Sequence, residues 1–201
     1  MIRRLLLALA LGAGLAATLP ATAQTTEVAG VRYDNSISLG GSTLQLNGAG
    51  VRYRLIVKVY TAGLYLNAKA TTPEAVLANT GPRRLHIVML RDIDANELGK
   101  LFIKGIEQNT SRDEFAKAIP GTIRLGELFA EKKNLKAGES FSIDWLPGVG
   151  TVILVNGKAS GEAIKEPEFF NSLMKIWLGT SPADRLLKDA LLGQARETRT
   201  N

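Results

Sequence analysis

The sequence predicts an α+β fold, in which a mostly antiparallel sheet carries helices on one face. Strand-like and helical segments are segregated along the chain, in the order strands, helical block, strands, helices. Such segregation is typical of antiparallel sheets whose helices pack on one side. The pairs Gly40-Gly41 and Asn156-Gly157 adjoin strand-like runs. Both pairs indicate tight hairpin turns, and therefore antiparallel neighbours.

The first 23 residues read as a secretory signal peptide. Arg3 and Arg4 precede an apolar run that ends near Ala17, and Ala21-Thr22-Ala23 forms a small-x-small cleavage site. An uncleaved membrane anchor is the alternative, but the apolar run is short for a spanning helix. We therefore expect a single domain over residues 24–201, periplasmic or secreted, with no integral membrane span after signal removal.

Composition excludes several classes of function. The chain contains no cysteine, which rules out disulfides, thiol chemistry and cysteine-ligated metals. The formal net charge of +6 falls to +4 when Arg3 and Arg4 leave with the signal. Basic residues are spread along the chain, without a basic helix interleaved with aromatics, so no nucleic-acid partner is expected. A small anionic ligand is compatible with this charge.

The first half of the mature chain is predicted to be mainly strand. Two short strands flank Gly40-Gly41, and Arg52 to Leu66 reads as one long strand. Thr72 as N-cap and Pro73 at the first helical position predict a short helix. Residues 83–93 then read as a strand that is covered on both faces.

A helical block and a second group of strands follow. The segment DANELGKLFIKGIEQN has an apolar stripe at helical spacing. Ser111 and Glu114 form a capping-box pair at the start of the next helix, which Pro120-Gly121 is expected to interrupt. The segments ESFSIDWL and GTVILVNGK read as strands joined by a turn at Pro147-Gly148.

Two helices are predicted to close the chain. The first begins at Pro167 and stops at Gly179. The second opens with Ser181 as N-cap and Pro182 at its first helical position.

The usual catalytic and metal-binding patterns are absent from the sequence. His86 is the one histidine and lies within a strand, without the spacing of a zinc motif. No G-x-S-x-G turn and no complete G-x-G-x-x-G stretch is present. We therefore expect neither a metal nor a bound cofactor.

Arg52 and Tyr60 are the main candidates for a ligand site. Strand alternation over Arg52 to Leu66 would place both side chains on one face. A guanidinium and a phenol on one face can stabilise an oxyanion or hold a carboxylate. The alternative is structural, with Arg52 in an ion pair and Tyr60 in the core.

The stretch LNGAGVRYRLIVKVYTAGLYL resembles the chalcone isomerase fold family. Plant members carry a Gly-Ala-Gly-Val-Arg stretch followed by a strand that ends in Gly-Val-Tyr-Leu. The counterparts here are Gly48 to Arg52 and Gly63 to Leu66. NGKASGEAI looks like that family's last strand turn, and EFFNSLMKIWLGTSPADRLLKDAL looks like its final two helices. The resemblance covers roughly residues 28–192 and points to the exported bacterial branch of chalcone isomerase-like proteins.

The resemblance implies an open β-sandwich-like fold, in which an antiparallel sheet is backed by helices with a ligand cleft between them. Arg52 matches the arginine that stabilises negative charge when a phenolate closes a flavanone ring. In this interpretation Gly48 to Gly50 form a bend that presents Arg52 to the cleft.

The other family positions match less well. The family's threonine aligns with Tyr60, with Thr61 one residue away, and a substrate-contacting polar residue falls near Ile176 or Trp177. The family's tyrosine and lysine pair at the start of the first long helix has no tyrosine counterpart in RDIDANELGKLF. The implied ligand-binding residues are therefore Arg52, Tyr60 and Trp177, with Arg52 and Tyr60 as catalytic candidates.

Three functions follow from these observations. The first is binding of a small anionic or acyl, fatty-acid-like ligand, as in non-catalytic relatives of this fold that hold the carboxylate with the arginine. The second is an isomerase, an intramolecular lyase that acts on an enone-type small molecule. The third is a structural or partner-binding domain. The retained Arg52, together with the lost polar companions, favours the first.

Overall fold

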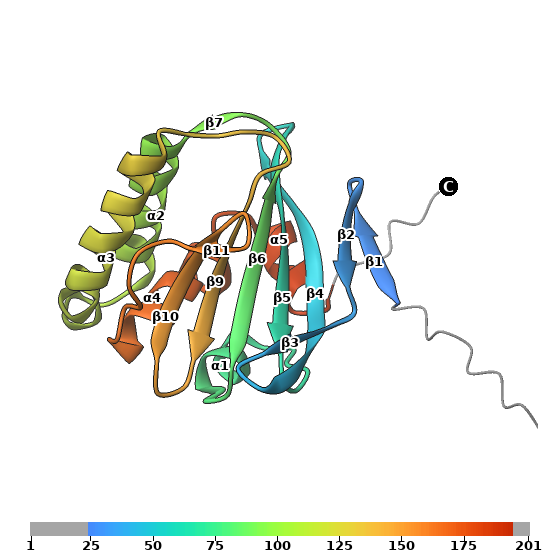
Figure 1. Cartoon of the computed structure of the whole chain (residues 1–201), viewed down its shortest axis with the longest axis horizontal. Helices are drawn as coiled ribbons and strands as arrows, with labels where there is room; N and C mark the ends of the chain where they lie inside the picture. Colours follow the sequence, from blue (N-terminus) through green and yellow to red (C-terminus); the bar gives the residue numbers. More distant parts are fainter. Residues whose placement is uncertain (1–23, 195–201) are drawn as a thin grey trace, which may run out of the picture.

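The computed structural model describes residues 24–194, so the predicted signal peptide and its cleavage site lie outside the described residues. The main element is a curled antiparallel sheet with helices on one face and a short hairpin on the other (Figure 1). The α+β prediction is therefore confirmed. Its strands, in spatial order, are β11 (Lys158–Ala159), β10 (Gly150–Val155), β9 (Ser140–Leu146), β6 (Arg83–Met89), β5 (Val57–Leu66), β4 (Ser42–Arg54) and β3 (Ser36–Leu39).

Two smaller strand pairs and the helices complete the fold. The pairs are β1 (Thr25–Val28) with β2 (Val31–Asp34), and β7 (Ile93–Asp94) with β8 (Asn134–Leu135). The helices are α1 (Pro73–Ala78), α2 (Ala95–Asn109), α3 (Arg112–Lys132), α4 (Pro167–Leu178) and α5 (Arg185–Leu191). Across residues 24–194, none of the helices combines the length and the apolar character that crossing a bilayer requires.

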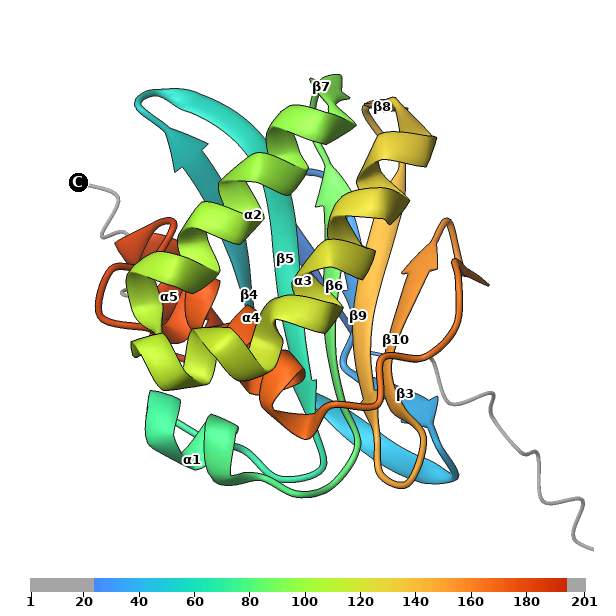
Figure 2. The same cartoon turned by 90° about the vertical axis from the view of Figure 1, so that its left-hand side faces the viewer.

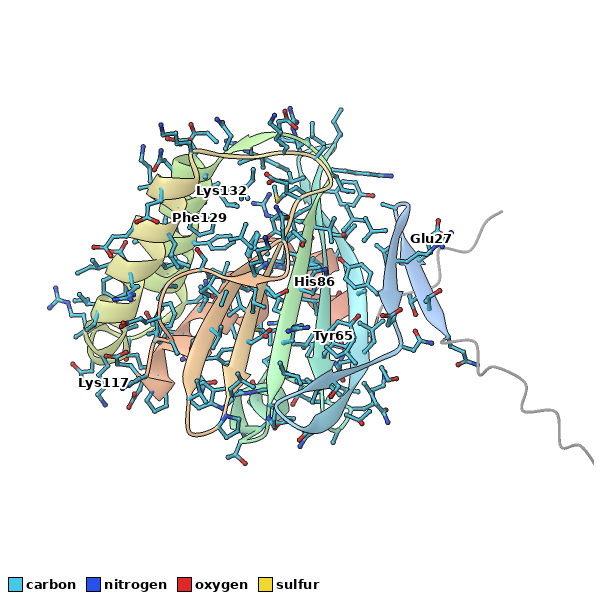
Figure 3. All side chains as sticks on the ribbon, viewed as in Figure 1. Glu27, Tyr65, His86, Lys117, Phe129 and Lys132 are labelled. Atoms are coloured by element: carbon cyan, nitrogen blue, oxygen red, sulfur yellow. The ribbon has the colours of Figure 1, made fainter. Side chains whose placement is uncertain are left out.

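The main core lies between the sheet and the layer of α2, α3 and α4 (Figure 2). Phe129 of α3 points toward the sheet (Figure 3). Its ring packs edge-on against Phe102 of α2 and Phe141 of β9, with centroids 5.5 and 5.9 Å away. On the opposite face, the ring of Tyr33 in β2 packs so closely on Gly63 that a Cβ there would stand 2.5 Å from it. Each face of the central strands is therefore covered.

The prediction of one long strand from Arg52 to Leu66 is wrong. The strand β4 ends at Arg54, β5 begins at Val57, and Leu55 with a following isoleucine forms a two-residue hairpin loop. Leu55 has a φ of 57°, in the left-handed region that some hairpin turns need and that leucine seldom adopts. No glycine, asparagine or proline marks this turn, so the sequence pattern could not reveal it.

The expected interruption at Pro120-Gly121 is also wrong, because α3 continues through it. The predicted capping box is present: Ser111 Oγ accepts from the Glu114 backbone N–H at 3.3 Å, and Glu114 Oε2 accepts from the Ser111 N–H at 2.9 Å. An interior proline costs a helix about 3 kcal/mol. Gly121 lies so close to Phe169 of α4 that a Cβ would stand 2.4 Å from the ring. Packing of this turn against α4 offsets the cost of the proline.

The last helix begins at Arg185, not at Pro182. Asp184 is its N-cap, and its Oδ1 accepts from the backbone N–H groups of Leu186 and Leu187 at 2.8 and 3.2 Å. Its Oδ2 accepts from the backbone N–H of Tyr53 at 2.8 Å. This carboxylate therefore caps α5 and ties it to β4, which Ser181 could not do.

The glycine break, predicted to be a bend, lies beside an irregularity in β4, and its glycines also let α5 pack directly on the strand. A Cβ on Gly48 would stand 2.0 Å from the Ala190 carbonyl oxygen, and one on Gly50 would stand 2.6 Å from the Ala190 Cβ. The irregularity is a β-bulge at Asn47. Its side-chain amide donates to the Leu191 carbonyl at 2.7 Å. The absence of side chains at Gly48 and Gly50 lets the α5 backbone pack against the strand.

We expect Gly48→Ala to lower the free energy of unfolding by about 2–3 kcal/mol, because the added methyl group meets helix backbone that cannot yield. Gly126→Ala is the matched control. A Cβ on Gly126 meets only Ile103 Cδ1, at 3.9 Å. The free energy of unfolding of this variant should therefore rise by about 0.5–1 kcal/mol, because alanine favours a helix more than glycine does. Urea unfolding followed by circular dichroism measures both. Equal stability of Gly48→Ala and the unaltered protein would show that α5 does not rest on Gly48.

Candidate functional site

A cavity of about 820 Å³ opens where the β4–β5 hairpin meets α2 and the loop after α4. Helix α2 lies over β5 in this region (Figure 2). This volume is within the range of about 300–1,000 Å³ that is usual for small-molecule sites. Much of the wall is apolar and includes Val59, Leu98, Leu101, Phe102 and Ile176.

Arg52 and Tyr60 both line this cavity. They are directly opposite each other in the antiparallel register of β4 and β5. Their shared face therefore arises from cross-strand pairing, and not from the alternation along one strand that we expected. The Arg52 guanidinium carbon lies 5.8 Å from the centroid of the Tyr60 ring, within the range of a cation–π contact.

The half-buried side chain of Arg52 has no counter-ion within the part of the chain that the structure describes. Among residues 24–194, ion pairs within 4.0 Å form at five other places, and none of them involves Arg52. The ion pair that a purely structural role would require is therefore not formed within the described part of the chain. A guanidinium stays charged at any physiological pH, so this site offers a permanent positive charge to an anion.

Tyr60 is a buried hydrogen-bonding group beside that charge. The side chain is 1% exposed, and its hydroxyl oxygen accepts from Trp177 Nε1–H at 2.9 Å. Burial raises the pKa of Tyr60 to about 12, although the Arg52 charge and the Trp177 hydrogen bond act in the opposite direction. At neutral pH Tyr60 is therefore a neutral phenol that can donate its proton in a hydrogen bond.

Trp177 lies behind Tyr60, outside the cavity wall. The indole is fully buried and packs edge-on against Phe102, with ring centroids 5.2 Å apart. This location differs from that of the expected direct ligand contact, because Trp177 does not line the cavity. Trp177 instead fixes the direction of the Tyr60 hydroxyl.

His86 and Thr61 lie on the other face of the sheet. His86 Nδ1 is 2.8 Å from Ser142 Oγ, and burial lowers the pKa of its imidazole. Thr61 Oγ1 accepts from the Tyr33 hydroxyl at 2.7 Å. Neither residue can reach a ligand in the cavity. Within residues 24–194 no cluster of three histidine, aspartate or glutamate side chains is suited to a metal ion.

Sequence reasoning missed several charged residues of the cavity. Arg54, Arg91 and Lys104 line it and form no ion pair among the described residues. They come from three separate segments, and the β4–β5 hairpin, which the sequence did not reveal, brings Arg54 to the same cavity wall as Arg91. The basic spacing in RYRLIVK is a signal that could have pointed to Arg54, whereas no local pattern links Arg91 or Lys104 to it.

Carboxylates also line the cavity, but each has a partner. Asp92 Oδ1 accepts from the Ala137 backbone N–H at 2.9 Å, and Asp94 caps α2. Glu97 pairs with Lys100 at 2.8 Å. The cavity wall thus carries four basic side chains, Arg52, Arg54, Arg91 and Lys104, and three carboxylates, of which Glu97 alone forms an ion pair among residues 24–194.

Comparison with known proteins adds two findings. A family model described as chalcone isomerase-like matches residues 25–193. A solved structure of a fatty-acid binding protein from Arabidopsis thaliana is similar, with a TM-score of 0.63 and 14% sequence identity, over 83% of this chain and 93% of that chain. At this identity the structural likeness shows the fold alone. A search of curated proteins found no match.

Because the Tyr60 phenol is buried, we expect the protein to lose stability at high pH. Burial raises the pKa of Tyr60 to about 12 from 10.0. The unfolded chain therefore loses this proton near pH 10 while the folded protein keeps it, and the free energy of unfolding falls as pH rises from 10 to 12. We expect a shallower fall for Tyr60→Phe, measured by urea unfolding at a series of pH values. Identical slopes for the two proteins would contradict the buried, neutral phenol.

Proposed function

The chain belongs to the chalcone isomerase-like family, and from this premise we propose that it binds an acyl or other apolar carboxylate in the cavity. One observation carries the proposal: the guanidinium of Arg52 has no ion-pair partner among the described residues and lines a largely apolar cavity. An amphipathic anion complements both properties, since its carboxylate meets the guanidinium and its tail meets the apolar wall.

The contacts around Arg52 suit a carboxylate. A guanidinium can donate two parallel hydrogen bonds to the two carboxylate oxygens, and such charge-assisted bonds are stronger than neutral ones. The neutral Tyr60 hydroxyl adds a donor next to it. Because Trp177 holds the Tyr60 oxygen at 2.9 Å, this donor is already oriented before a ligand arrives, which lowers the entropy cost of binding.

The apolar wall suits an acyl chain. Leu98, Leu101 and Phe102 of α2 face Val59 of β5 across the cavity. Burial of each methylene contributes about 0.8 kcal/mol. The ligand named for the Arabidopsis protein is a fatty acid, which supports this class of ligand. With the pattern of residues 1–23, we propose that binding takes place in the periplasm or outside the cell.

Isomerisation of an enone is the second candidate. Arg52 and Tyr60 together would stabilise negative charge on an enolate oxygen. Ring closure also needs a group that removes the proton of the attacking phenol. Tyr60 is neutral, and the carboxylates of the cavity wall, Asp92, Asp94 and Glu97, already have partners. The geometry therefore supports binding better than catalysis.

We expect Arg52→Gln to weaken binding of a long-chain fatty acid by about ten- to a hundredfold, the usual contribution of hydrogen bonds to a charged group. Affinity for the methyl ester of the same acid should change little, because the ester carries no charge. Arg32→Ala is the matched control, since Arg32 is an exposed residue of β2 and does not line the cavity. Titration calorimetry measures the affinity of the unaltered protein and of both variants for the acid and for its methyl ester.

If the Arg52→Gln variant keeps its affinity for the fatty acid, the proposal is wrong. The unaltered protein should also be incubated with a 2′-hydroxychalcone and followed by absorbance. Flavanone formation above the uncatalysed rate, abolished in Arg52→Gln, would establish the isomerase instead.

A further inference from the structure

The tip of the β4–β5 hairpin presents two large apolar side chains to solvent. Leu55 is 95% exposed and Ile56 is 92% exposed, and Val57 beside them is 39% exposed. Leu55 also adopts the left-handed backbone conformation, with a φ of 57°, at a position where glycine, asparagine or aspartate is usual. Hydrophobic residues at such a position contribute nothing to the core. Adjacent apolar side chains exposed in this way are typical of a surface that contacts another apolar phase.

Basic side chains surround this tip. Arg54 and Lys58 flank it directly, and both are exposed. Arg91 follows β6 in the chain, and the Leu90 backbone N–H donates to the Val59 carbonyl at 3.0 Å, which places Arg91 at the same end of the sheet. The nearby carboxylates of Asp92 and Asp94 accept hydrogen bonds from backbone N–H groups.

The tip is also part of the cavity. Arg54, Leu55 and Val57 belong to its wall, and the hairpin extends outward at the upper left of Figure 2. Whatever the tip contacts therefore stands at the entrance to the candidate site.

We propose that the β4–β5 hairpin tip docks on an anionic lipid bilayer, with Leu55 and Ile56 entering the interface and Arg54, Lys58 and Arg91 contacting the headgroups. An apolar tip surrounded by basic residues matches the two layers of a membrane surface, since apolar side chains enter the acyl boundary and cations stay among the phosphates. Docking would hold the cavity entrance against the bilayer. Exchange of an acyl ligand with that bilayer is the consequence that rests on the proposed function, whereas docking itself does not.

A second copy of the chain is a poorer occupant. Contact between two such tips would bring like charges from both copies together, and this repulsion opposes association. The same charges attract an anionic membrane, so the charge pattern distinguishes the two partners.

Because the chain contains no cysteine, a single introduced cysteine can carry a dye at one chosen position. A polarity-sensitive dye on Ile56→Cys reports on the tip alone, so an apolar segment elsewhere in the chain does not produce its signal. Val149→Cys is the matched control, because Val149 is 49% exposed in the β9–β10 turn at the opposite end of the sheet. The probes are vesicles of phosphatidylcholine with and without phosphatidylglycerol.

We expect the dye at position 56 to shift to shorter wavelengths with anionic vesicles and the dye at position 149 not to change. The shift should shrink with neutral vesicles and with added salt. No shift at position 56, or an equal shift at both positions, would overturn the proposal.

Two further variants separate docking from ligand binding. Neither Ile56 nor Lys58 lines the cavity. Ile56→Asp should lower the partition coefficient onto anionic vesicles by about tenfold, and Lys58→Ala should lower it by about fivefold. Both should keep the fatty-acid affinity that Arg52→Gln loses. Dimerisation that Ile56→Asp abolishes, without vesicle binding, would overturn the proposal in favour of self-association.

Discussion

The pairing of Arg52 with Tyr60 across β4 and β5 places a guanidinium and a phenol together on the wall of the cavity. Side chains alternate between the faces of a sheet, so a slip of one residue would turn Arg52 toward β2 and away from the helices. Two contacts hold the register. Trp177 fixes the Tyr60 hydroxyl, and Asp184 bonds to the backbone of Tyr53, next to Arg52. The position of Arg52 thus depends on two residues, Trp177 and Asp184, that do not line the cavity.

Much of the fold could be predicted from local signals. Gly40-Gly41 and Asn156-Gly157 do form hairpin turns, with positive φ at all four residues. Thr72, Ser111 and Pro167 mark helix starts as expected. In these cases the residues at the turn or cap decide the structure by themselves, because backbone conformation and hydrogen-bonding capacity are local properties. The proposed role of Arg52 also began with the sequence.

The rest could not be predicted, because distant residues decide it. Leu55 turns the chain in a conformation that its own type disfavours, and strand pairing on both sides imposes that turn. Pro120 stays in a helix because α4 packs against the same turn, at Gly121. The basic lining of the cavity comes from three segments that only the tertiary fold brings together. The near-complete burial of Tyr60 beside the Arg52 charge could not be predicted from the sequence either, although Tyr60 itself was a candidate site residue.

The packing of α5 against β4 affects the order in which the chain folds. The Asn47 side chain meets the Leu191 carbonyl across 144 residues of sequence. Contacts of such separation form only after the loop between them has closed, which makes them late and slow. During synthesis, the strand that carries Arg52 is made early but gains its supporting helix only when almost the whole chain is available. Residues of α5, which do not line the cavity and are made last, thus decide when this region acquires its final shape.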